Sequence, residues 1–151
     1  MPRLQNSISI RAERQRVFDI TNDIPRWPEY FDEYVEAKVL TSTRMGQFTS
    51  LTFELSNSVS SWRSWRLLDH INYFAIAERE SPLFPFAYMH LRWSYAEAEQ
   101  GTEMTWTQDF ELDDRFERPL PEVLNSMQVH TRQNQVNIKR FIEATPADSG
   151  R

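Results

Sequence analysis

The sequence predicts an α+β fold in which one long C-terminal helix covers a curved antiparallel sheet of six or seven strands. Between Glu33 and Asp113, extended stretches of roughly eight to twelve residues alternate with polar or Pro/Gly breaks. Beyond residue 120, apolar residues recur at intervals of three and four, as on one face of a helix. One helix cannot fill the concave side of such a sheet, so we expect a cavity between the helix and the sheet.

The first part of the chain predicts one strand and two short helices. Polar and apolar residues alternate over Ser7–Ala12, which indicates a strand. Apolar residues then cluster at near-helical spacing over 17–20, before the Asn22-Asp23 break. The segment Ile24–Phe31 contains two prolines. Proline fits the first turn of a helix but not its interior, so the second helix is expected to be short.

Six further strands are expected in the central part of the chain. They are Tyr34–Thr41, Phe48–Leu55, Val59–Leu68, Tyr73–Arg79, Phe86–Ala96 and Met104–Leu112. In the last two, large and mostly apolar side chains alternate with polar ones, which is typical of an antiparallel sheet with one covered face. The turn Glu99–Thr102 contains Gly101 and joins these two strands as a hairpin.

The last element is expected to be a helix over 121–144, roughly 36 Å long. Its inner stripe is apolar towards both ends and polar in the middle. The stripe comprises Leu120, Leu124, Met127, Thr131, Asn134, Ile138, Phe141 and Ile142. Thr131 and Asn134 are expected to be polar contacts of the cavity, or alternatively spacers that touch water. The 151 residues fit one domain, expected over 1–145, with a frayed tail at 146–151.

Composition narrows the range of functions. Hydrophobic residues make up 40% of the chain and aromatic residues 13%, which suits either a large core or a cavity for a flat ligand. The net charge of −5 and the lack of a basic run argue against nucleic acid as a partner. No apolar run is long enough to predict a membrane span or a signal peptide. We therefore expect a cytoplasmic protein without a membrane partner.

The sequence carries no signature of metal or cofactor chemistry. It has no cysteine, and His70, His90 and His130 lie far apart without a carboxylate at a ligand spacing. Glycine-rich phosphate-binding and dinucleotide-binding motifs and the hydrolase motif GxSxG do not occur. We expect neither a metal nor a cofactor.

Polar groups interleaved with aromatics are the remaining candidates for a site. Trp62, Ser64 and Arg66 share one face of a predicted strand, because side chains alternate with a period of two. The opposite face carries Arg63 and Trp65. Since each face has one tryptophan and at least one arginine, the pattern leaves open which face is inside.

Several motifs occur here in an order known from one enzyme family. They are TNDIxxWPExFxEYxEA over 21–37, Trp62-x-Ser64-x-Arg66, PFAYMxLxWxY over 85–95, GTEMxW over 101–106, and Thr131-Arg132-x-Asn134. Together they resemble the single-domain aromatase/cyclases of bacterial type II polyketide synthases, of the tetracenomycin type. The resemblance spans residues 7–143.

The resemblance implies a START-like helix-grip fold whose cavity receives a poly-β-ketone chain tethered to an acyl carrier protein. The family folds that chain, closes the first ring by intramolecular aldol condensation and dehydrates it to an aromatic ring. Its proposed catalytic arginine and tyrosine carry over to Arg66 and Tyr34. Substrate-binding positions are expected at Trp27, Phe31, Trp62, Ser64, Arg79, Phe86, Met89, Trp93, Thr131 and Asn134.

These residue types suit the implied chemistry. An aldol step generates an enolate and then an alkoxide, and a guanidinium in a dry pocket stabilises both. A phenol can donate or accept a proton. We expect Arg66 to lower the pKa of Tyr34 by favouring the phenolate. The alternatives are that Arg66 pairs with a surface carboxylate and that Tyr34 is a tyrosine at the edge of the core.

Two features depart from the family pattern. The relatives carry a tryptophan where this chain has Ser60, and the segment Glu80–Pro85 is one residue longer here. Both differences are expected to alter the volume of the pocket.

The resemblance implies an acidic acyl carrier protein and other type II polyketide synthase subunits as partners. Because this chain is acidic as well, docking would need a local basic patch. The candidates are Arg11, Arg14 and Arg16, or Arg132, Lys139 and Arg140. The alternative function is a non-catalytic carrier of lipids or quinones with the same fold. An unpaired arginine in the cavity would argue against a carrier, since burying its charge is costly.

Overall fold

A computed structural model describes residues 2–80 and 82–145, so the frayed tail expected at 146–151 lies outside the described part of the chain. The elements are β1 (Arg3–Ile10), α1 (Arg14–Thr21), η1 (Ile24–Arg26), α2 (Trp27–Tyr30), β2 (Glu36–Met45), β3 (Phe48–Ser56), β4 (Ser61–Asp69), β5 (Phe74–Arg79), β6 (Phe86–Ala98), β7 (Gly101–Leu112) and α3 (Leu120–Ala144). This order confirms the predicted succession of strand, short helices, run of strands and long helix.

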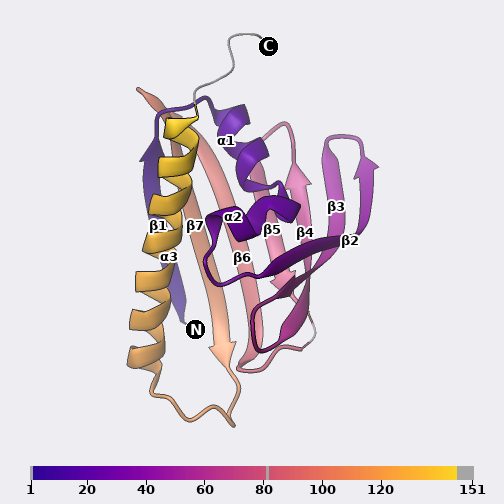
Figure 1. The fold of residues 1–151 in the computed structure, drawn as a ribbon, viewed down its shortest axis with the longest axis vertical. Coiled ribbons are helices and arrows are strands. Elements are labelled where there is room, and N and C mark those ends of the chain that lie inside the picture. Colours follow the sequence, from indigo (N-terminus) through magenta and orange to yellow (C-terminus); the bar gives the residue numbers. More distant parts are fainter. Residues whose placement is uncertain (1, 81, 146–151) are drawn as a thin grey trace.

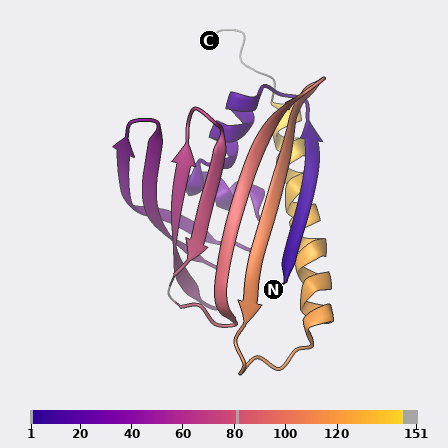
Figure 2. The same ribbon diagram turned by 180° about the vertical axis from the view of Figure 1, so that it is seen from behind.

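The seven strands form one antiparallel sheet in the order β1-β7-β6-β5-β4-β3-β2. Helix α3 runs along the β1 and β7 side of the sheet, and the short helices lie beside it on the same face (Figure 1). The opposite face carries no helix (Figure 2). All the helices therefore gather on the concave face, where the cavity was expected.

Several strand boundaries differ from the prediction, among them the starts of β1, β2, β4 and β7. Strand β1 begins at Arg3 and not at Ser7, because its first residues already pair with β7, starting with Arg3 opposite Asp109. Strand β2 begins at Glu36, so Tyr34 lies in the connection between α2 and the sheet. That connection is free to turn Tyr34 towards the cavity instead of holding it in the pleat.

The hairpin between β6 and β7 depends on Gly101. Its φ is +152°, and an added Cβ would lie 2.2 Å from the Ile10 carbonyl oxygen. Only glycine fits this close approach of β1 to the turn, which explains the residue.

The inner stripe of α3 differs from the prediction at its first turn. Leu120 is 38% exposed, whereas Val123 is buried against Met89 and Phe110. Gln135 is also buried and donates to the carbonyl oxygen of Asn6 in β1. The first buried apolar residue of the helix therefore comes one turn later than expected. In the described part of the chain, no helix is long and apolar enough to span a membrane.

Candidate functional site

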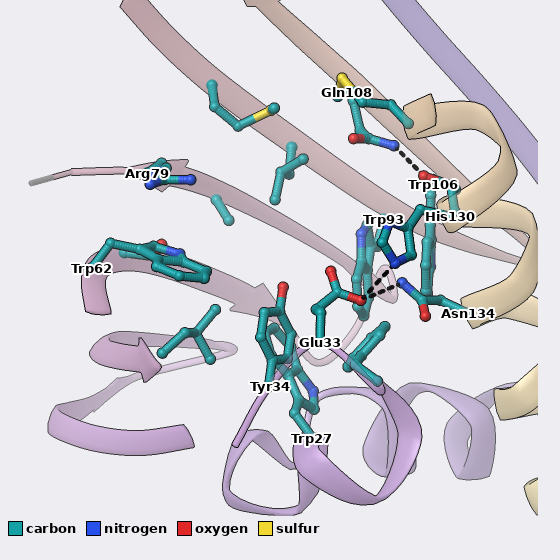
Figure 3. A pocket seen from close by; sticks show the side chains of 18 of the residues that line it. Trp27, Glu33, Tyr34, Trp62, Arg79, Trp93, Trp106, Gln108, His130 and Asn134 are labelled. Atoms are coloured by element: carbon teal, nitrogen blue, oxygen red, sulfur yellow. Dashed lines mark hydrogen bonds and ion pairs between the residues drawn. The ribbon is translucent and has the colours of Figure 1, made fainter. Parts of the chain in front are cut away.

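A cavity of about 380 Å³ lies between the concave face of the sheet, α3 and the segment around α2. All twelve residues predicted as catalytic or substrate-binding line it. Figure 3 shows several of them projecting into the same space from the sheet, from α3 and from the α2 segment. Ser126 and His130 are the exposed lining residues on α3, so the cavity opens beside the N-terminal half of that helix. Their roles in binding and catalysis remain predictions.

The structure resolves which face of β4 is inside. Ser64, Arg66 and Leu68 are buried, whereas Ser61 and Arg63 are exposed. Trp62, Ser64 and Arg66 therefore face the cavity. The alternative of a surface ion pair for Arg66 is wrong, because the side chain is only 1% exposed.

Arg66 packs against two adjacent indole rings, whose centroids are 5.7 Å apart. Its guanidinium carbon is 4.2 Å from the centroid of the Trp93 ring and 5.3 Å from that of the Trp27 ring. Its Nε donates to Oδ1 of Asn22 at 2.9 Å. Aromatic faces attract a cation, and more strongly when water is excluded. These contacts hold the charge without a carboxylate.

The guanidinium is incompletely satisfied. One terminal nitrogen, NH2, is buried and has no hydrogen-bond partner among the described residues. Burial lowers the pKa of Arg66 to about 10, although the nearby phenols of Tyr95 and Tyr34 oppose this shift. Arg66 thus remains a cation at neutral pH and has a free donor for an anionic group.

A buried network below the cavity fixes the position of Arg66. The Tyr95 hydroxyl hydrogen-bonds to Oγ1 of Thr21 at 2.7 Å and accepts from Nδ2 of Asn22 at 3.2 Å. Asn22 in turn accepts from Arg66, so the end of α1 anchors a side chain of β4. Because Asn22 also donates to the Phe18 carbonyl oxygen, its amide has one orientation.

Tyr34 packs among aromatic rings at the cavity wall. Its ring stacks on Trp27 with a centroid distance of 6.1 Å and contacts Phe31 and Trp62 edge to face. Removal from water raises the pKa of its phenol above the usual value of 10, and the negative charge of Glu33 adds to this effect. Arg79 and Arg66 oppose the shift without reversing it.

The expected lowering of the Tyr34 pKa is therefore wrong in its net sign. The charge of Arg66 does favour the phenolate, but the loss of hydration outweighs it. Tyr34 is a neutral phenol at neutral pH and can donate a hydrogen bond or a proton. It is not suited to act as a base.

The remaining wall is aromatic on the sheet side. The Trp93 and Trp106 rings stack at 4.1 Å with an interplanar angle of 9°. Trp27 is held by its Nε1, which donates to the Thr21 carbonyl oxygen at 3.0 Å. Such flat and rigid surfaces suit a flat or folded unsaturated ligand.

Arg79 closes another side of the cavity, near the start of β6. Its guanidinium carbon lies 4.6 Å from the Trp62 ring centroid, and burial lowers its pKa. It donates to the carbonyl oxygens of Pro82 and Phe84, which lie in the segment expected to be longer than in the relatives. These two carbonyl oxygens position Arg79. The other departure, Ser60, is exposed and does not line the cavity.

Five polar lining residues were not predicted as site residues from the sequence, namely Glu33, Asn57, Gln108, Ser126 and His130. Nδ2 of Asn134 donates to Oε1 of Glu33 at 3.1 Å, and Nε2 of His130 lies 4.0 Å from the same oxygen (Figure 3). Gln108 donates to Oγ1 of Thr131 at 2.8 Å. Glu33 stands beside Tyr34 within the first motif, which could have drawn attention to it. The further lining residues are Phe53, Leu55, Ala77, Leu91, Trp106 and Met127.

The histidines give no metal site with their neighbours. Within residues 2–80 and 82–145, no group of three or more His, Cys, Asp or Glu side chains is placed to hold a metal ion.

Solved structures share this architecture. The chain superposes on a START superfamily protein from Mycobacterium smegmatis with a TM-score of 0.74, covering 94% of this chain and 97% of that chain at 13% identity. It superposes on the ZhuI aromatase/cyclase from Streptomyces sp. R1128 with a TM-score of 0.70, covering 92% and 89% at 13% identity. These likenesses confirm the START-like helix-grip fold.

Sequence comparison assigns the family. The chain is 38% identical over 114 residues to the "Putative polyketide cyclase" of Streptomyces cyaneus, which covers 72% of both chains. It is 33% identical over 104 residues to the "Putative polyketide cyclase" of Streptomyces halstedii, covering 68% of this chain and 94% of that protein. The family model described as polyketide cyclase/dehydrase and lipid transport matches residues 1–143. The chain therefore belongs to the polyketide cyclase/dehydrase family.

Proposed function

We propose that this protein is an aromatase/cyclase that folds a carrier-bound poly-β-ketone chain and directs closure and dehydration of its first ring. The observation that carries the proposal is a buried and charged Arg66, unpaired with any carboxylate of the described residues, in a cavity walled by tryptophans. In such a cavity a guanidinium stabilises enolate and alkoxide oxygens, which form only as the reaction proceeds.

The aromatic wall supplies the folding of the chain. A poly-β-ketone is flexible, and ring closure requires two particular carbons to meet. The stacked Trp93 and Trp106 and the ring of Trp27 offer flat surfaces beside Arg66. Holding the chain in one bend removes rotational freedom before the reaction. This lowers the activation free energy of ring closure by roughly several kcal/mol.

Arg66 and Tyr34 then act on the same oxygen in different ways. The free terminal nitrogen of Arg66 donates to the ketone oxygen under attack. Tyr34 is neutral, because its pKa is raised, and donates a second hydrogen bond as negative charge develops. Two donors in a site of low dielectric favour the alkoxide over the ketone.

The carrier hypothesis accounts less well for the same features. A protein that only transports an apolar lipid or quinone gains nothing from an unpaired guanidinium, whose burial costs several kcal/mol. Arg66 is held there by Asn22 and two indoles, which is an arrangement for keeping a charge inside a cavity.

Docking of an acyl carrier protein is part of the proposal, and each of the two candidate basic clusters contains a residue that is already engaged within the protein. Lys139 pairs with Glu143 at 2.6 Å, and Arg16 donates to the carbonyl oxygens of Ile142 and Thr145. Both sets of contacts lie at the C-terminal end of α3, whereas the cavity opens beside its N-terminal half. We expect charge reversal of Arg132, which follows the cavity-lining residue Thr131 in α3, to slow turnover more than charge reversal of Arg14.

Reconstitution with a minimal type II polyketide synthase tests the function. Adding the wild-type protein should divert unguided products to one first-ring regiochemistry, and the uncharged Arg66→Met variant should abolish this diversion. A control variant, Arg63→Met on the exposed face of the same strand, should behave as the wild type. An unchanged product profile on adding the wild-type protein would contradict the enzyme function.

A further inference from the structure

Five titratable side chains line the cavity, and they differ in whether they can accept a proton. They are Glu33, Tyr34, Arg66, Arg79 and His130. The two arginines are cations at neutral pH, and the phenol of Tyr34 keeps its proton because its pKa is raised. An aldol ring closure begins with removal of a proton from a methylene group between two carbonyls, so the proposed function needs a base that none of these three supplies.

The carboxylate of Glu33 and the imidazole of His130 are the remaining groups, and they lie together. Nε2 of His130 is 4.0 Å from Oε1 of Glu33, and Nδ2 of Asn134 donates to that oxygen at 3.1 Å. The other oxygen, Oε2, has no hydrogen-bond partner among the described residues, and Figure 3 shows the carboxylate turned into the cavity beside the Tyr34 ring. One oxygen is fixed and the other is left for the substrate.

The His130 side chain is more exposed to solvent than the Glu33 side chain. The side chain of Glu33 is 33% exposed and that of His130 is 64% exposed. The carboxylate therefore sits inside the opening, and the imidazole sits at its outer edge. A proton taken up inside can pass to the imidazole and from there to water.

We propose that Glu33 is the general base of this cavity, that Asn134 orients its carboxylate, and that His130 exchanges the proton with solvent. This inference rests on the proposed function and adds the group that starts its reaction. Carboxylates act as bases next to carbonyls in other enzymes where neighbouring donors stabilise the enolate. Arg66 and Tyr34 are such donors here.

The steps balance without any further reagent. Glu33 takes one proton from the methylene carbon, the electron pair of that C–H bond forms the new C–C bond, and the attacked ketone oxygen becomes an alkoxide beside Arg66. Glu33 passes its proton through His130 to water, and the alkoxide takes a proton from water, so that one proton leaves the cavity and one enters it. In the dehydration Glu33 takes the second proton from the same carbon, the C–O bond breaks, and the departing hydroxide leaves with that proton as water.

The test compares Glu33→Gln with the matched control Glu36→Gln, an exposed carboxylate at the start of β2 outside the cavity. We expect Glu33→Gln to lower the rate of directed ring closure about 100-fold, as is usual for loss of a general base. Glu36→Gln should keep the wild-type rate. Binding of a flat polyphenol, read from quenching of tryptophan fluorescence, should be retained in both variants, which excludes misfolding as the cause.

The pH profile separates a base from a merely structural carboxylate. The wild-type rate should fall on the acid side as the base becomes protonated, and this limb should disappear in Glu33→Gln. His130→Ala should lower the rate about tenfold, and free imidazole should restore it. Lack of rescue would remove His130 from the proposal.

The outcomes distinguish the inference from the function on which it rests. If the wild type directs ring closure and Glu33→Gln does so at the same rate, the base is wrong and the function stands. If the wild type leaves the products unchanged, both are wrong.

Discussion

The Nε of Arg66 donates to Oδ1 of Asn22 across 2.9 Å, so a side chain at the end of α1 holds the cation that packs on the Trp93 ring. This bond replaces the carboxylate that usually accompanies a buried arginine. The guanidinium keeps its charge and one free donor. The effect of the buried charge on stability can be measured independently of the ring-closure reaction.

Arg66→Met should raise the free energy of unfolding by about 1 kcal/mol while abolishing activity. Replacing a buried charge with an apolar side chain of similar size is often stabilising, and the lost bond to Asn22 offsets part of the gain. Urea denaturation at pH 7 measures the change. A marked loss of stability would show that Arg66 serves the fold and not the reaction.

Tyr34→Phe should lower the rate of ring closure about 10- to 100-fold, because one of two donors to the alkoxide is lost. It should also change the alkaline stability. Since the folded pKa of Tyr34 lies above its unfolded value of about 10, the unfolded chain loses this proton first and stability falls as pH rises above 10.

The difference in unfolding free energy between wild type and Tyr34→Phe isolates this group from Tyr95 and Arg66, which titrate in the same range. The variant should lose less stability than the wild type between pH 10 and 11. Identical slopes for the two proteins would mean that the phenol is not desolvated.

Asp69→Asn should remove a source of acid-sensitive stability at the turn after β4. Burial disfavours the ionised carboxylate, but hydrogen bonds from Asn72, Gln47 and the Ile71 amide outweigh this and lower its pKa to about 2. A lowered pKa stabilises the fold above the unfolded value near 4, and the contribution is lost as pH falls towards 2. Unfolding midpoints at pH 7 and pH 3 should therefore differ less in the variant than in the wild type.

Ala77→Leu should shrink the cavity at little cost in stability. Ala77 lines the cavity opposite Arg66 in the register of β4 and β5, so the added carbons enter open space. Binding of a large flat ligand should weaken about tenfold. The matched control is Ala75→Leu in the packed core, which should cost about 1–3 kcal/mol through overpacking. Equal destabilisation by both substitutions would argue against an open cavity at Ala77.

The arrangement of elements was predictable because each carried its own periodicity. The alternation in β6 and β7 and the stepping of apolar residues in α3 gave the sheet and the helix that covers it. The inner face of β4 was not predictable, since both faces carry a tryptophan and an arginine. Only the register with β3 and β5 turns Arg66 inwards.

Two features of the site depend on long-range contacts and could not be read from residue types. The sign of the Tyr34 pKa shift results from competition between desolvation and two distant arginines. The meeting of Glu33 with Asn134 joins positions 101 residues apart. Leu120 was wrongly assigned to the inner stripe of α3, because residue spacing alone does not tell at which turn a helix first contacts the core.

Helix α3 has two parts with different roles, one that packs in the core and one that lines the cavity. Ile138 and Ile142 seal the closed end against the core, while Met127, Thr131 and Asn134 face the ligand space. Substitutions in the second group can reshape what is accepted without loosening the first. Evolution can therefore change the ligand specificity of such a protein through a few positions on one helix while the fold stays the same.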